Sequence, residues 1–157
     1  MPVFLALSLA ACSTARRTDD PARGYRYHVR AIERLKMLDY ESALECMDSA
    51  VTLDPDNIYG WINKGLIEIR ADRPVEEPHA SFSEAIRRIE KIRFRDVREG
   101  ERSYYGRVYL YRSRLNRMPG DSAAAVADSI KAEKYRYETR LGAGANLRSP
   151  RRFSCSS

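Results

Sequence analysis

Three observations predict that the chain is all-α, a stack of about three antiparallel helical hairpins. Small residues recur seven positions apart within stretches of helical length, as at Ala43 and Ala50. Proline or glycine interrupts the chain between such stretches, as at Pro74 and Gly120. An apolar content of 43% with 32% charged residues is typical of a folded helical protein. Because the pattern repeats, we expect paired helices that pack on copies of themselves.

The first hairpin is defined by the segment YESALECMDSAVTLDPDN, which begins at Tyr40. The segment resembles a known helical repeat of about 34 residues, and placing Ala43 at position 20 of that pattern starts this copy at Gly24. Tyr27 then takes the aromatic position 4 and Ala31 the small position 8. The remaining expected positions are Met47, Ala50 and the terminating Pro55.

A second copy is expected to begin one repeat length later, at Ile58. Trp61 fills its aromatic position and Gly65 its small position, where a small residue lets two helices approach closely. A turn is expected at Arg73-Pro74. After a one-residue insertion, Pro78 opens the second helix, and Phe82 and Ala85 fit its packing positions.

A third, weaker copy begins near Gly106, with Tyr109, Ser113, Ala125 and Ala132 at the equivalent positions. The second unit is therefore longer than a standard repeat. We interpret the surplus as a lengthened helix around Phe82, a break near Gly100 and an entry into the third hairpin.

Over roughly Gly24–Tyr137 this pattern resembles the tetratricopeptide repeat family. The resemblance implies an α-solenoid that binds other proteins through a groove lined by the first helix of each hairpin. Only Asn63 matches the carboxylate clamp of the chaperone-binding members, so we do not expect that clamp. The predicted groove residues are Tyr25, His28, Ile32, Lys36, Tyr59, Ile62, Asn63, Leu66, Arg70, Arg107, Tyr111 and Arg114, with Val29, Leu35, Ile69, Leu110 and Arg117 at further groove positions.

The N-terminus contains a short apolar run, Val3–Ala11, which suits a signal peptide and is too short to span a membrane. It ends in Leu9-Ala10-Ala11-Cys12, which resembles the lipobox of bacterial lipoproteins. That resemblance implies a signal peptide over residues 1–11 and a diacylglycerol-modified Cys12. Because Ser13 and not Asp follows, it also implies the periplasmic face of the outer membrane. An ordinary signal peptide or a chance cysteine is the alternative.

The flanking segments are predicted to be unstructured. Residues 12–23 are polar without an apolar period and suit a flexible tether, and residues 138–157 suit a basic disordered tail. A Cys46–Cys155 disulfide is possible, although a buried thiol at Cys46 is the favoured interpretation.

Positive charge gathers in the second half of a chain whose net charge is +6. The region Arg87–Arg117 suits an anionic partner, such as an acidic protein face, lipid phosphates or an envelope polymer. A solvated helix face is an equally good explanation. Nucleic acid is not expected, because tyrosines at helical spacing usually serve packing; those considered are Tyr104, Tyr105, Tyr109 and Tyr111, interleaved with Arg107, Arg112 and Arg114.

Catalytic patterns are missing from the sequence. His28 and His79 have no carboxylate or cysteine at metal-ligand spacing, and no phosphate-binding loop or nucleophile–base pattern occurs. We expect no enzymatic activity, no metal and no cofactor. Two hypotheses remain: a lipid-anchored periplasmic scaffold that assists envelope or outer-membrane complex assembly, and a cytoplasmic protein–protein adaptor with an accidental lipobox.

Overall fold

The computed structural model describes residues 20–118 and 120–142. These residues form α-helices and one short 3-10 helix, with no strand among them, which confirms the all-α prediction. The elements are α1 (Pro21–Lys36), α2 (Tyr40–Leu53), α3 (Ile58–Arg70), α4 (Glu76–Ile89), η1 (Phe94–Asp96), α5 (Glu99–Arg117) and α6 (Ser122–Gly142).

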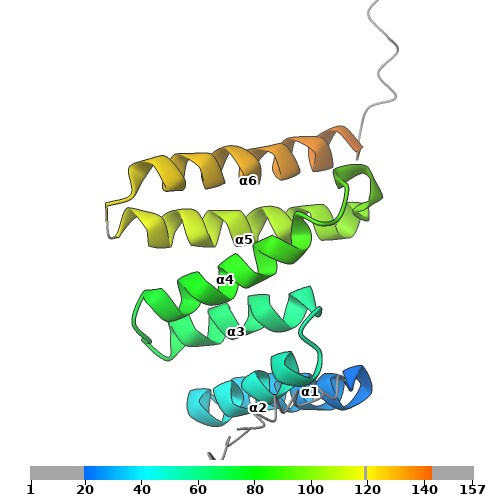
Figure 1. Cartoon of the computed structure of the whole chain (residues 1–157), viewed down its shortest axis with the longest axis vertical. Coiled ribbons are helices and arrows are strands. Elements are labelled where there is room, and N and C mark those ends of the chain that lie inside the picture. The colour runs from blue at the N-terminus through cyan, green and yellow to red at the C-terminus, as the bar shows by residue number, and fades with distance from the viewer. Residues whose placement is uncertain (1–19, 119, 143–157) are drawn as a thin grey trace, which may run out of the picture.

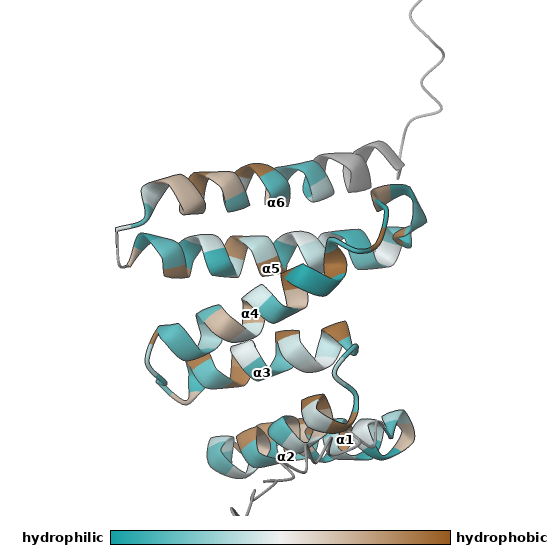
Figure 2. Ribbon diagram, viewed as in Figure 1, coloured by the Kyte–Doolittle hydropathy of each residue, from teal (hydrophilic) through white to brown (hydrophobic). Residues whose placement is uncertain are grey.

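The helices form three antiparallel pairs, α1–α2, α3–α4 and α5–α6, stacked along the long axis of the molecule (Figure 1). Between the pairs, α2 packs on α3 and α4 on α5, so the main contacts of each pair are with the next pair along the chain. Hydrophobic and hydrophilic residues alternate along the helices (Figure 2), as expected where each helix buries one face.

The turn inside each pair has the same backbone geometry. Leu38, Asp72 and Gly120 each adopt a positive φ, of 60°, 54° and 90°. In each turn the residue that follows donates its amide to a carbonyl five positions back, as Asp39 does to Arg34. The intervals between the three turn positions equal the intervals between the predicted starts of the three repeats.

Small residues bring the paired helices together at the predicted Gly65 and also at Gly24 and Gly106, which the repeat pattern marked only as repeat starts. A Cβ on Gly24 would lie 3.2 Å from the carbonyl oxygen of Ala50, and a Cβ on Gly106 would lie 3.2 Å from that of Ala132. The glycine and the alanine are equally far apart along the chain in both cases, so the first and third helical pairs share one register. In the second pair, a Cβ on Gly65 would meet the Phe82 ring at 2.8 Å.

The connection between the second and third pairs differs from the prediction. α4 is not lengthened: it ends at Ile89, and a nonhelical connection with η1 follows. The predicted break near Gly100 lies just before it, between Ile89 and Glu99, and Gly100 itself is in the first turn of α5. The connection is held because Val97 is 3% exposed in the core and the Phe94 ring lies 4.9 Å from that of Tyr135.

Two predicted boundaries also shift. α1 begins at Pro21, inside the predicted tether, with Asp20 accepting a hydrogen bond from the Arg23 amide as the N-cap. α6 continues through Gly142, so the predicted tail begins inside a helix. The predictions for the signal peptide, for Cys12 and for Cys155 lie outside the described residues, and Cys46 is half-buried on α2 as a free thiol.

Candidate protein-binding surface

A series of hydrogen-bonded side chains joins the first helices of all three pairs. The amide nitrogen of Asn63 on α3 lies 3.0 Å from Nε2 of His28 on α1. The Tyr104 hydroxyl on α5 donates to the Asn63 amide oxygen at 3.4 Å. Because the Asn63 amide oxygen accepts from Tyr104, the Asn63 amide nitrogen donates to an unprotonated ring nitrogen of His28. Burial lowers the pKa of His28, which keeps the imidazole neutral and matches that role.

A second contact set links α3 to α5. The Tyr59 hydroxyl donates to Oε1 of Glu101 at 3.0 Å, and its ring centroid lies 5.3 Å from that of Tyr104. Burial and the hydrogen bond to Glu101 raise the pKa of Tyr59, so its hydroxyl stays protonated. The first helices of successive pairs therefore form one continuous side of the stack.

Large apolar side chains are exposed on each of these three helices. Tyr25 and Val29 on α1, Ile69 on α3 and Leu110 on α5 are between 39% and 64% exposed. All four occupy predicted groove positions. With His28, Asn63 and Tyr104 they define what we call the A-helix surface, which presents apolar anchors beside polar groups.

The other predicted groove residues divide into three groups. The prediction that Ile62 lines the groove is wrong. Ile62 is 1% exposed and packs in the core, because α3 turns this residue toward α4 and α5. Ile32, Leu66 and Tyr111 are half-buried, and the Tyr111 ring stacks on Phe82 at 5.5 Å. The exposed ones are Lys36, Arg70, Arg107 and Arg114.

The arginines after Arg87 are mostly neutralised by carboxylates of the same chain. Arg87 lies 2.9 Å from Glu84, Arg93 2.9 Å from Asp96 and Arg98 2.6 Å from Glu101. Arg112 is held more deeply by two bonds to Asp128. Within the described residues, the exposed arginines of this region without such a partner are Arg107, Arg114 and Arg117.

Sequence reasoning missed Tyr104 as part of this surface and Glu101 as the partner of Tyr59. Both precede Gly106, the predicted start of the third repeat, so the repeat register assigns them to surplus sequence. The signal was available in the spacing: Tyr104 and Tyr111 lie seven positions apart, the interval that repeats on one face of a helix.

No protein-family model matches the chain, and no curated protein is significantly similar to it. Residues 20–118 and 120–142 contain no group of three or more His, Cys, Asp or Glu side chains arranged to hold a metal ion. Over the same residues, no helix combines the length and apolar character that crossing a membrane requires.

Proposed function

We propose that this chain is a tetratricopeptide-like scaffold that binds a protein partner on its A-helix surface. The supporting observation is that the first helices of the three pairs each carry exposed apolar residues and are linked by the His28–Asn63–Tyr104 hydrogen bonds. An extended or helical segment suits this surface, since apolar anchors supply affinity and amide groups supply orientation.

The exposed charges favour a partner with an acidic end. Arg107 and Arg114 on α5 have no carboxylate partner among the described residues, whereas the α1 end of the surface carries Tyr25 and Val29. An apolar segment followed by acidic residues would place each part against its complement. An anionic envelope polymer is a narrower second candidate, limited to Arg107, Arg114 and Arg117, because the neighbouring arginines are already paired.

Site-specific crosslinking tests partner binding. A photo-crosslinking residue at Tyr25, Ile69 or Leu110 should capture one and the same protein in cells. Val126 on α6 is the matched control, because it is 54% exposed and lies on a helix outside the A-helix surface. A product formed from Val126 and not from the three test positions would contradict the proposal.

We further propose that Cys12 carries a lipid anchor and that the helical stack faces the periplasm from the outer membrane. This part is supported by the Leu9-Ala10-Ala11-Cys12 sequence. Labelling with a palmitate analogue should mark the chain, and Cys12→Ser should abolish the label. Label that persists in Cys12→Ser, or an unlabelled native chain, would favour the alternative of a cytoplasmic adaptor.

A further inference from the structure

The first helix carries a cluster of arginines around one aromatic ring. Arg23, Arg26 and Arg30 line a shallow cavity of about 300 Å³ together with Tyr27. The guanidinium carbons of Arg23 and Arg30 lie 5.9 and 5.7 Å from the centroid of the Tyr27 ring. The ring holds two positive charges on the same side of the helix as Arg26.

The described residues do not neutralise this arginine cluster. Within the described residues, no carboxylate lies within ion-pair distance of any of its three guanidinium groups, which are all exposed. Glu33, the acidic residue of α1, is among the carboxylates that lie outside ion-pair distance. Asp48 of α2 lines the adjoining cavity with Arg23, but it lies 2.6 Å from Nζ of Lys64. The cluster therefore retains its positive charge.

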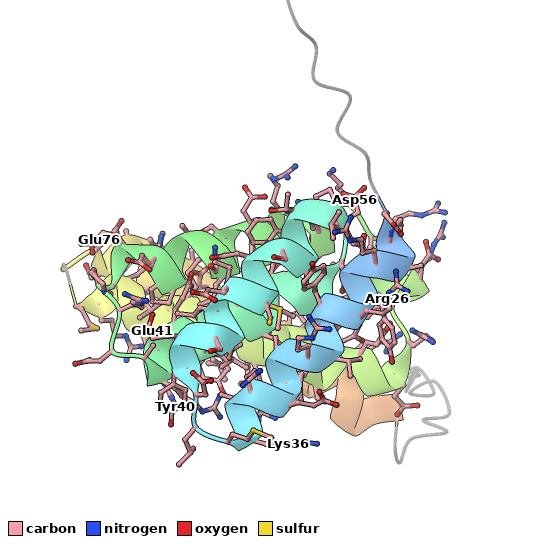
Figure 3. All side chains as sticks on the ribbon, turned by 90° about the horizontal axis from the view of Figure 1, so that it is seen from below. Arg26, Lys36, Tyr40, Glu41, Asp56 and Glu76 are labelled. Atoms are coloured by element: carbon pink, nitrogen blue, oxygen red, sulfur yellow. The ribbon has the colours of Figure 1, made fainter. Side chains whose placement is uncertain are left out.

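The cluster and His28 of the A-helix surface occupy opposite sides of α1. At 3.6 residues per turn, Arg23, Arg26 and Arg30 fall on one stripe, and His28 and Ile32 lie about half a turn around from it. Figure 3 looks onto the α1–α2 end of the stack, where Arg26 is labelled on α1. A ligand on the cluster leaves His28 free, whereas Val29, three positions after Arg26, lies beside the cluster.

The position of the cluster in the chain favours a membrane as its ligand. Only a short segment separates Cys12 from Arg23, and a fully extended chain of that length spans no more than about 40 Å. A lipid on Cys12 would hold the cluster continuously near the headgroups, at high effective concentration. Guanidinium groups match phosphate oxygens in geometry as well as in charge.

We propose that Arg23, Arg26 and Arg30 bind the phosphates of anionic phospholipids at the membrane that anchors the chain. This contact turns the α1–α2 end of the stack toward the lipid and the His28 side of α1 away from it. The inference rests on the lipid anchor proposed above.

Vesicle binding tests the cluster without the acyl chains. The full chain carrying Cys12→Ser is mixed with phosphatidylcholine vesicles that contain or lack phosphatidylglycerol, and the ratio of the two partition coefficients is measured. Each basic residue at an anionic surface strengthens binding by about fivefold. The triple variant Arg23→Gln, Arg26→Gln, Arg30→Gln should lower the ratio on the order of a hundredfold, and its helicity is checked by circular dichroism.

The matched control removes the same charge from paired arginines. Arg87→Gln, Arg93→Gln, Arg98→Gln should retain the ratio within a few fold. Equal losses in both triple variants would mean that net charge alone drives binding. No loss in the variant of Arg23, Arg26 and Arg30 would mean that the cluster does not bind the vesicles. Either result overturns the inference.

Two further binding measurements identify which kind of anion the cluster binds. Titration with inorganic phosphate should show no saturable binding; saturable binding lost in the Arg23, Arg26, Arg30 variant would overturn the lipid assignment. Binding of polyglutamate by the cluster, without binding of anionic vesicles, would overturn it in favour of an acidic polypeptide. Because every vesicle arm lacks Cys12, a normal palmitate label with an unchanged ratio leaves the anchor standing and removes only this inference.

Discussion

The first and third helical pairs share their packing but use arginine differently. In both, a glycine in the first helix packs on the carbonyl of an alanine at the equivalent position of the second helix. In α1 the arginines stand exposed around Tyr27, whereas in α5 Arg112 is drawn into a polar network with α6. The comparison teaches that a repeat register fixes how helices approach, while neighbouring carboxylates decide whether an arginine supports the fold or remains free for a ligand.

The largest expected effect comes from Asp128, the buried carboxylate that pairs with Arg112 in the third helical pair. Asp128 is 3% exposed and accepts hydrogen bonds from Arg112 at 2.7 and 2.8 Å and from Asn116 at 3.2 Å. Asp128→Ala leaves Arg112 unpaired in a half-buried site, so we expect a loss of about 3 kcal/mol in the free energy of unfolding, measured by urea denaturation.

Glu133→Ala is the control on the same helix. The exposed pair Glu133–Arg136 has an N–O distance of 3.6 Å, and its loss should cost less than about 1 kcal/mol. Similar costs for Asp128→Ala and Glu133→Ala would contradict a structural role for the Arg112 network.

Substitution of the shared glycines tests the common register. Gly24→Ala and Gly106→Ala would place a Cβ 2.9 Å from Asp54 Cβ and 3.0 Å from Tyr135 Cβ. Each variant should lose about 2 kcal/mol of unfolding free energy, because the helices must move apart. Thermal or urea unfolding gives the measurement.

Gly100→Ala supplies the opposite expectation. No atom lies within 4 Å of a Cβ added there, and the residue is in the first turn of α5. Alanine should stabilise the protein by up to about 1 kcal/mol through its higher helix propensity. Stabilisation by Gly106→Ala as well would refute the close approach of α5 and α6.

The junction between the second and third pairs is tested at Tyr59. Tyr59→Phe removes the hydrogen bond to Glu101 and keeps the ring contact with Tyr104, so we expect a loss of about 1 kcal/mol in unfolding free energy. Tyr25→Phe, at a side chain 64% exposed, should change it by less than about 0.5 kcal/mol. A larger loss of unfolding free energy in Tyr25→Phe than in Tyr59→Phe would contradict a stabilising role for the Tyr59–Glu101 hydrogen bond.

The smallest expected effect is a pH dependence at the junction of the first and second pairs. Burial lowers the pKa of His28 below its ordinary 6.5, so the unfolded chain takes up the proton first as the pH falls. Stability from neutral His28 is complete above about pH 6.5 and decreases below it, until the pH reaches the lower pKa of the folded state.

The measurement compares urea unfolding near pH 7.5 and near pH 5.5 in native protein and in His28→Gln. The variant should lose less stability than the native protein on acidification, with His79 unchanged in both. An equal loss in both proteins would place the pH dependence elsewhere.

Much of the fold followed from the sequence, because small residues and turns act locally. The spacing of Leu38, Asp72 and Gly120 reproduces the intervals predicted between the starts of the repeats. The connection after Ile89 was predicted wrongly, because nothing local distinguishes a longer α4 from a segment held by Val97 and Phe94. The tetratricopeptide resemblance and the lipid anchor stay predictions.

The candidate surface was predicted less completely. Repeat positions identified Tyr25, His28 and Asn63, but also Ile62, whose burial depends on the approach of α4 and α5. The region Arg87–Arg117 was predicted as either a basic footprint or a solvated helix face, since a linear sequence does not show that Arg87, Arg93 and Arg98 meet Glu84, Asp96 and Glu101.

The sequence by itself determined that helices form and where the chain turns within each pair, because these properties depend on residues within one or two turns. Only the tertiary structure decided which polar groups meet across the stack and which charges stay unpaired. Those outcomes depend on distances between residues far apart in the chain, as between His28 and Asn63, and around Arg26 they leave positive charge exposed.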